Sequence, residues 1–297
     1  MADTLRILVT GGKGQLAQCL RKQQPEAYAV TYAPRAALNL EDHASTRAQI
    51  TGMKPDVVIN AAAYTKVDQA EKEPDAAFAA NELAVKNLAE VCRDTGALLL
   101  HISTDFLFHG AFNRPIDEQQ APAPIGIYAQ SKLAGEKAVL ASGVSGAIVR
   151  TSWLYSEFGN NFMKTMIRLA GEKPRLTVIA DQHGSPTYAG DLAAALWQMT
   201  EKLAERKLAR CQTWHFSNYG VTTWYDFAVN ILVLAGSKTP VEPILTAEYP
   251  VPTPRPAYSA LWPRGFSQEF DFPIRNWRLA LADAVAAYNK QQDGAFL

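Results

Sequence analysis

The fold of this chain is decided by Arg6-Ile7-Leu8-Val9-Thr10-Gly11-Gly12-Lys13-Gly14-Gln15-Leu16-Ala17. The run Arg6–Thr10 is typical of a buried strand, and the glycines that follow it lead into a helix. Gly11 permits a tight turn, Gly14 lets the backbone approach a pyrophosphate, and the small Ala17 lets helix and strand pack closely. The N–H groups and dipole of the helix start favour phosphates. The stretch predicts dinucleotide binding, with an ordinary strand-to-helix turn as the alternative. The predicted cofactor contacts here are Gly11, Gly12, Gly14, Gln15 and Leu16.

Short apolar runs alternate with amphipathic stretches through the first half of the chain. Further strands are predicted at Tyr28–Ala33, Asp56–Asn60, Ala97–Ser103 and Ala147–Arg150, and a helix over Pro74–Thr95. Strands that alternate with helices are typical of βαβ units and a parallel sheet. We therefore predict an α/β fold of the Rossmann type, a doubly wound parallel sheet with a smaller C-terminal lobe.

The second half of the chain has a less regular pattern. Residues 1–152 are predicted to form the cofactor-binding domain and 153–297 mainly a substrate-binding lobe, with a segment at about 176–236 returning to the first domain. The range Pro240–Pro256 contains six prolines, too many for a regular element to be expected there.

Composition excludes several classes of function. With 29 basic and 29 acidic residues the formal net charge is zero, which argues against a nucleic-acid or anionic-membrane binder. No apolar run approaches the ~18 residues of a membrane span, and Asp3 and Arg6 interrupt the first apolar stretch, so we expect neither a span nor a secretory signal. The three cysteines have no disulfide or metal spacing. These features predict a cytoplasmic protein without a metal site.

The end of the predicted second strand bears on cofactor choice. NAD sites normally place an acid about 20 residues after the glycine motif, where it binds the ribose hydroxyls. This chain has Ala33-Pro34-Arg35 there, with no carboxylate before Glu41. Arg35 would attract a 2′-phosphate, so we predict a preference for NADPH over NADH. The alternatives are NADH use and a merely solvated Arg35.

A second candidate group follows the predicted fourth strand. Tyr128 and Lys132 are four residues apart in a predicted helix over Ile127–Leu140 and so share one face. A nearby cation lowers the pKa of a tyrosine, as acid–base chemistry requires. The polar residues Ser103-Thr104-Asp105 end the fourth strand, and ligands of open α/β sheets bind beyond such ends. Thr104 is predicted to hydrogen-bond a substrate oxygen beside Tyr128; the alternative is that Thr104 and Asp105 only cap the next loop.

These motifs together resemble the extended short-chain dehydrogenase/reductase superfamily and, within it, the family of dTDP-4-dehydrorhamnose reductases. The resemblance covers nearly the whole chain. It is carried by Gly14-Gln15-Leu16, Asn60–Thr65, Ser103–Phe106, Tyr128 with Ser131–Glu136, Arg150–Tyr155, Asp181–Thr187 and Trp224–Ala228.

The resemblance implies a ketone reduction at C4 of dTDP-4-dehydro-L-rhamnose with NADPH, giving dTDP-L-rhamnose for cell-surface polysaccharide. Tyr128 would protonate the developing alkoxide, Lys132 would hold the nicotinamide ribose and lower the tyrosine pKa, and Thr104 would hydrogen-bond the carbonyl oxygen. Asn81 would help to position Lys132 through water.

Further binding residues follow from the same resemblance. Ala61, Ala62, Ala63 and Tyr64 match the segment beneath the cofactor, and Asn39 and Leu40 match the adenine contacts. Tyr128 and Lys132 are expected to contact the cofactor as well. Substrate contacts are expected from Thr104, Asp105, Trp153 and Arg255, with Arg255 either on the diphosphate or on the surface. The aromatic cluster Trp224-Tyr225-Phe227 is expected in the core because of its helical spacing.

The chain also departs from the family pattern. Some members bind Mg²⁺ through glutamates at a dimer interface, but Gln15 stands at one of these positions and is a weaker ligand. This argues against a metal-bridged dimer and leaves a metal-free homodimer open. A 4,6-dehydratase would need a second acid after Asp105, where Phe106 stands. Another nucleotide-sugar 4-keto reductase, and a non-catalytic subunit resembling the regulatory partner of methionine adenosyltransferase, remain as alternatives.

Overall fold

A six-stranded, wholly parallel sheet forms the centre of the computed structural model, which describes residues 4–206, 210–249 and 253–294. The strand order is β10-β5-β4-β3-β1-β2. From β1 the chain crosses to β2 on one side of β1, and from β2 it returns to β3 on the other side. The direction of winding therefore reverses between β1 and β3, and a crevice for ligands opens at such a point. This confirms the doubly wound α/β fold. The strands are β1 (Arg6–Thr10), β2 (Ala29–Ala33), β3 (Val57–Asn60), β4 (Leu98–Thr104), β5 (Gly146–Thr151) and β10 (Cys211–Phe216).

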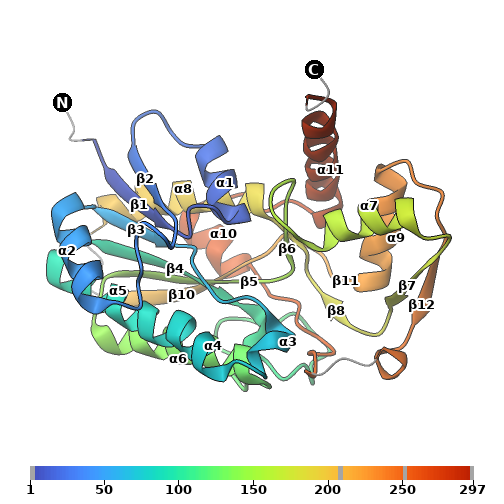
Figure 1. The fold of residues 1–297 in the computed structure, drawn as a ribbon, viewed down its shortest axis with the longest axis horizontal. Coiled ribbons are helices and arrows are strands. Elements are labelled where there is room, and N and C mark those ends of the chain that lie inside the picture. The colour runs from blue at the N-terminus through green and yellow to red at the C-terminus, as the bar shows by residue number, and fades with distance from the viewer. Residues whose placement is uncertain (1–3, 207–209, 250–252, 295–297) are drawn as a thin grey trace.

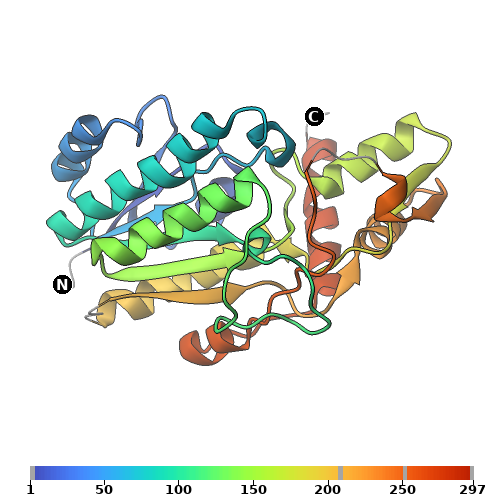
Figure 2. The ribbon, with the colours of Figure 1, turned by 90° about the horizontal axis from the view of Figure 1, so that it is seen from below.

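Helices cover both faces of the sheet. Along β1, Ile7 and Val9 pack into one core with Leu196, whereas Leu8 packs on the other face with Leu88, as the two-residue period of a strand requires. Figure 2 shows α5 and α6 side by side over one face. The first face carries α1 (Gln15–Lys22), α8 (Ala189–Glu205) and α10 (Arg264–Phe270); the second carries α2 (His43–Met53), α5 (Ala84–Thr95) and α6 (Ile127–Ser142).

A second group of elements lies off the carboxyl ends of the strands (Figure 1). Its helices share a separate core around Phe227 and Trp277, both fully buried. The group consists of α7 (Phe162–Glu172), α9 (Trp224–Leu234), α11 (Trp277–Gly294) and the parallel pair β7 (Leu176–Ile179) and β12 (Val241–Ile244). Short strand pairs join it to the sheet: β6 (Leu154–Tyr155) with β9 (Thr187–Tyr188), and β8 (His183–Gly184) with β11 (Thr222–Thr223). The division of the chain into two lobes at residue 152 stays a prediction.

One local expectation is wrong. The proline-rich range was expected to contain no regular element, yet β12 and a short 3₁₀ turn, η3 (Thr246–Glu248), lie within it. Pro243 is tolerated because β12 is an edge strand with one neighbour, so a missing N–H need not break a ladder. Pro250 and Pro252 lie outside the described residues.

The predicted helix over Pro74–Thr95 is confirmed in its bounds, and the structure adds that it is not a regular α-helix throughout. It consists of α4 (Pro74–Phe78), a π-helical turn η1 (Ala79–Leu83) and α5. Two short elements complete the sheet domain, α3 (Val67–Ala70) and the 3₁₀ turn η2 (Asp105–Leu107). In the part of the chain that the structure describes, no helix is both long and apolar enough to cross a bilayer.

Candidate active site

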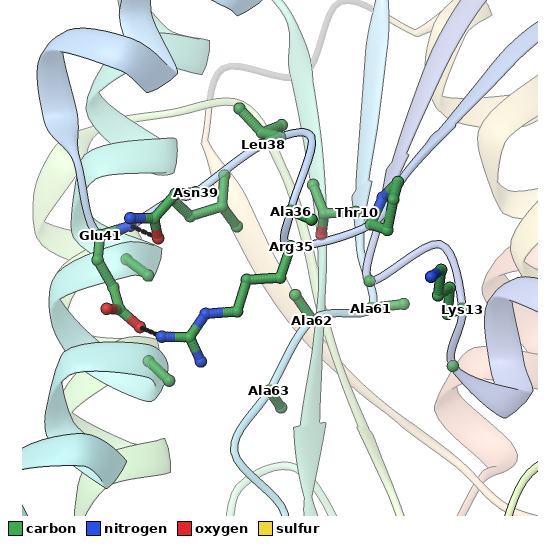
Figure 3. A pocket seen from close by; sticks show the side chains of 16 residues that line it. Thr10, Lys13, Arg35, Ala36, Leu38, Asn39, Glu41, Ala61, Ala62 and Ala63 are labelled. Carbon is green, nitrogen blue, oxygen red and sulfur yellow. Dashed lines mark hydrogen bonds and ion pairs between the residues drawn. The ribbon is translucent and has the colours of Figure 1, made fainter.

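A cavity of about 410 Å³ lies at the reversal point between β1 and β3 (Figure 3). Gly11 forms part of its floor with φ +66°, and a Cβ at this residue would lie 2.9 Å from the backbone of Ala61. Glycine is therefore required both for the turn and for the close approach. The predicted cofactor residues on this cavity are Gly11, Gly14, Arg35, Asn39, Leu40, Ala61, Ala62 and Ala63.

Helix α1 begins beside this cavity with features that suit an anion. Its N-cap is Gly14, which offers no side-chain hydrogen bond to the first turn, and that turn holds no acidic residue. Backbone N–H groups at a helix start that lack a side-chain cap favour phosphate oxygens. The donor set, the close backbone and the small alanines fit a dinucleotide.

At the far end of the cavity two oppositely charged side chains meet. Arg35 Nη2 lies 2.8 Å from Glu41 Oε1, and both residues line the cavity. The Glu41 N–H in turn donates to Asn39 Oδ1. The sequence argument noted Glu41 but did not foresee this pairing. Lys13, which also lines the cavity, was not predicted at all, since a lysine in a glycine-rich turn carries no distinctive signal.

Six predicted cofactor residues do not line the cavity, and two of them, Tyr128 and Lys132, belong to the group at the end of β4 described below. Leu16 is buried in the core, and Gly12 packs against the backbone of Tyr32. Gln15 points across to the loop after β6, where its side chain donates to Leu154 O and accepts from Ser156 and Asn161. The Tyr64 hydroxyl donates to Glu73. Cofactor contact by Gly12, Gln15, Leu16 and Tyr64 stays a prediction.

Thr104, Tyr128 and Lys132 come together at the carboxyl end of β4. Tyr128 and Lys132 lie on α6, which packs over β4, and all three side chains are buried. The Tyr128 phenol lies within hydrogen-bond reach of the Thr104 hydroxyl. Thr104 Oγ1 also accepts the Phe106 N–H, so this residue caps η2 as well. A threonine and a tyrosine placed in this way can bind one oxygen atom together.

The expected lowering of the Tyr128 pKa by Lys132 is not found. Burial raises the pKa of Tyr128 to about 12, against a smaller opposing effect from the Thr104 hydrogen bond. Lys132 Nζ donates instead to Ile102 O at 2.8 Å, and burial lowers its own pKa to about 8 while the charge of Glu136 opposes this. The phenol is thus protonated at neutral pH, the state that a proton donor needs.

The π-helical turn carries Asn81 toward α6. Its buried amide accepts the Tyr64 N–H at 2.9 Å and donates to Tyr64 O and to Ser131 Oγ, each at 3.0 Å. Ser131 donates to Tyr128 O. Asn81 therefore ties the segment after β3 to the helix that bears Tyr128 and Lys132, whereas the proposed link to Lys132 through water stays a prediction.

A buried ion pair lies one turn beyond Lys132 on α6. Arg150 of β5 binds the Glu136 carboxylate through Nε at 2.9 Å and Nη2 at 2.7 Å. Their side chains are 7% and 2% exposed. Arg150 Nη1 also approaches His215 Nε2, and the His215 ring bonds Ile116 O through Nδ1. Because guanidinium only donates, His215 is neutral with its proton on Nδ1, and burial lowers its pKa to about 3.

A second cavity of about 650 Å³ opens between the carboxyl end of β4 and the second group of elements. Trp153 and Trp224 stack in it with ring centroids 3.5 Å apart, and Trp153 adopts φ +45°, a strained conformation for a large side chain. Trp224 was expected in the core but lines this cavity, because Phe227 is the one aromatic residue of this cluster that α9 buries fully. The wall also contains Phe162, Lys173, Arg175 and Gln182, none of which was proposed as a site residue.

Two of the predicted substrate residues line this second cavity, Trp153 and Arg255. Arg255 Nη2 pairs with Asp68 at 2.8 Å, while Nη1 is buried without a hydrogen-bond partner. Asp105, the third of these predicted substrate residues, is buried and does not line the cavity; its carboxylate accepts a hydrogen bond from the Thr104 hydroxyl. Burial raises the pKa of Asp105 to about 7. A guanidinium group on the wall of a cavity suits an anionic ligand.

The sequence profile of the RmlD substrate-binding domain family matches residues 5–290. This chain belongs to that family. Its sequence is 38% identical to that of the dTDP-4-dehydrorhamnose reductase of Aggregatibacter actinomycetemcomitans, over 95% of this chain and 99% of the relative. It is also 38% identical to the spore coat polysaccharide biosynthesis protein SpsK of Bacillus subtilis, over 94% and 96% of the two chains.

A solved structure of a relative also matches this chain over nearly its full length. The dTDP-4-dehydrorhamnose reductase of Bacillus anthracis, in complex with NADP, superimposes with a TM-score of 0.89 at 38% identity, covering 96% of this chain and 99% of that one. The resemblance to this reductase family, inferred from short motifs, is thus confirmed over the full length of the domain.

Proposed function

We propose that this protein reduces the C4 ketone of dTDP-4-dehydro-L-rhamnose to dTDP-L-rhamnose with NADPH. The observation that carries the proposal is the buried Thr104, Tyr128 and Lys132 set at the end of β4, in a chain that matches a dTDP-4-dehydrorhamnose reductase over 95% of its length. A non-catalytic binding subunit would need the cavities but not a buried phenol, hydroxyl and ammonium in one place.

Bound in the first cavity, NADPH supplies a hydride to the carbonyl carbon. Thr104 and Tyr128 bind the carbonyl oxygen, and Tyr128 gives its hydroxyl proton to that oxygen as the C–H bond forms, so ketone, hydride and proton yield one alcohol. Lys132 would hold the nicotinamide ribose through its ammonium group, and a solvent proton would then replace the one that Tyr128 has given up.

The second cavity supports a nucleotide-sugar substrate. Arg255 would bind the diphosphate through the nitrogen that has no protein partner, and the Trp153 and Trp224 stack offers an apolar wall for the sugar. Another nucleotide-sugar 4-keto substrate is the second candidate, since a spore coat polysaccharide biosynthesis protein is as similar to this chain as the reductases are.

The test is the oxidation of NADPH by purified protein given dTDP-4-dehydro-L-rhamnose. We expect turnover in the wild type and a loss of at least a hundredfold in kcat for Tyr128→Phe, which removes the proton but keeps the ring. NADPH binding should persist in the variant. Tight NADPH binding with no turnover of this ketone or its stereoisomers would contradict the proposal and favour a binding subunit.

A further inference from the structure

We propose that Glu41 sets the balance between NADPH and NADH by competing with a 2′-phosphate for Arg35. The inference rests on the proposed dinucleotide binding and concerns a residue outside the glycine motif. It assigns a specificity-determining role to an acid that lies well beyond the usual position at the end of β2.

The geometry places the pair inside the cofactor cavity. Arg35 follows β2 and Glu41 precedes α2, and the segment between them folds so that the two side chains meet at 2.8 Å (Figure 3). The Arg35 side chain extends along the cavity toward Glu41 rather than toward Lys13. Arg35 is 75% exposed and Glu41 only 27%, so the arginine is the partner that is free to move.

The charges in this cavity are few. Among the described residues that line it, Glu41 is the one acid, and Lys13 and Arg35 are the bases. With its carboxylate paired to Arg35, the far end of the cavity has little net charge. A 2′-phosphate, which carries nearly two negative charges, must either draw Arg35 away from Glu41 or lie beside an uncompensated carboxylate.

The two cofactors therefore meet the pair differently. The 2′-phosphate of NADPH can bind Arg35 only if the ion pair between Arg35 and Glu41 breaks, and the Glu41 carboxylate then repels the phosphate. NADH leaves the pair intact, and its ribose hydroxyls can donate to a carboxylate, as they do to the usual acid of NAD sites. Because exposed ion pairs are weak, the expected effects are about three- to tenfold in affinity rather than hundredfold.

The experiment is isothermal titration of the full-length protein with NADPH and with NADH, without sugar substrate. For Glu41→Gln we expect the Kd for NADPH to fall and the Kd for NADH to rise, so that their ratio changes by about tenfold. For Arg35→Gln we expect NADPH to bind more weakly and NADH to be nearly unaffected. Opposite signs for the two cofactors separate this role from damage to the fold.

Asp94→Asn is the matched control. It removes one negative charge and an ion pair of similar exposure with Arg47, but it lies on α5 and does not line the cavity. Its cofactor ratio should equal that of the wild type. Equal ratios in Glu41→Gln, Asp94→Asn and the wild type, with both cofactors bound, would overturn this inference alone. Binding of neither cofactor by the wild type would overturn the proposed function and this inference with it.

Discussion

The carboxyl group of Asp105 is the clearest case of a single residue whose protonation changes near neutral pH. Its Oδ2 is buried without a hydrogen-bond partner, and burial raises its pKa from 3.8 to about 7. Between these values the folded state holds a proton that the unfolded chain has lost, so this group reduces the free energy of unfolding as pH rises toward 7. Asparagine does not titrate, so Asp105→Asn does not lose stability with rising pH through this group.

We therefore expect the melting temperature of Asp105→Asn, relative to the wild type, to increase from pH 5 to about pH 7 and to level off above that pH. Thermal unfolding followed by circular dichroism measures it. A difference that is the same at every pH would show that Asp105 is not buried with a raised pKa.

Glu136 is expected to act on Lys132 through charge. It lies one turn further along α6, and it opposes the lowering of the Lys132 pKa by burial. Glu136→Gln removes this carboxylate and leaves Arg150 as a buried cation nearby. The pKa of Lys132 should then fall below about 8, so the alkaline loss of kcat/KM should move to lower pH, by about one unit.

The matched control for this prediction is Glu157→Gln. Glu157 is also a buried carboxylate in an ion pair, with Lys22, but it lies in the loop after β6. Both variants should lose stability, and only Glu136→Gln should shift the pH profile. A lower rate with an unshifted profile in Glu136→Gln would assign Glu136 a purely structural role.

At the scale of elements, the π-helical turn and α6 determine where Tyr128 lies. They approach so closely at Gly135 that a Cβ there would lie 2.1 Å from Asn81 O. Helix α6 also begins against Glu71, whose carboxylate accepts the Ile127 N–H at 2.7 Å. An extra residue in the helix at η1 turns Asn81 toward both segments, which explains why this range departs from a regular α-helix.

We expect Gly135→Ala to push α6 away from η1, with a loss of about 1–3 kcal/mol in the free energy of unfolding and a large loss of turnover. Gly171→Ala is the control, because Gly171 also lies in a helix but has no atom within 4 Å of its Cβ position. That variant should be neutral or slightly more stable. Urea unfolding measures both, and equal stability of the two variants would contradict the close contact.

At the scale of the whole molecule, Gln15 connects the segments that surround the two cavities. Its amide lies at the start of α1, beside the cofactor cavity, and forms one hydrogen bond to Leu154 of β6 and two to Ser156 and Asn161 in the loop that follows β6. That loop connects Trp153 to Phe162, both on the wall of the second cavity. Gln15 therefore links the glycine turn to the substrate wall.

Gln15→Leu keeps the size of the side chain and removes these bonds. We expect KM for the nucleotide sugar to rise several-fold while the Kd for NADPH changes less than twofold, since the side chain points away from the first cavity. Steady-state kinetics and titration measure the two quantities. The reverse result, weaker NADPH binding at constant KM, would restore Gln15 to the cofactor contacts predicted from the motif.

The sequence by itself determined the features that depend on neighbours along the chain. The β1 strand with its glycine turn, the alternation of strands and helices along the sheet domain and the shared face of Tyr128 and Lys132 all follow from spacing over a few residues. Similarity of motifs then identified the family.

Only the tertiary structure decided how distant segments meet. Arg255 pairs with Asp68 across 187 positions and Gln15 with Asn161 across 146, and neither approach has a local signal. The same holds for the Trp153 and Trp224 stack and for the strand that contains Pro243. The raised pKa of Tyr128 likewise depends on its burial under the folded chain. Local spacing specifies an element and its exposed face, but partners and burial arise when the elements pack.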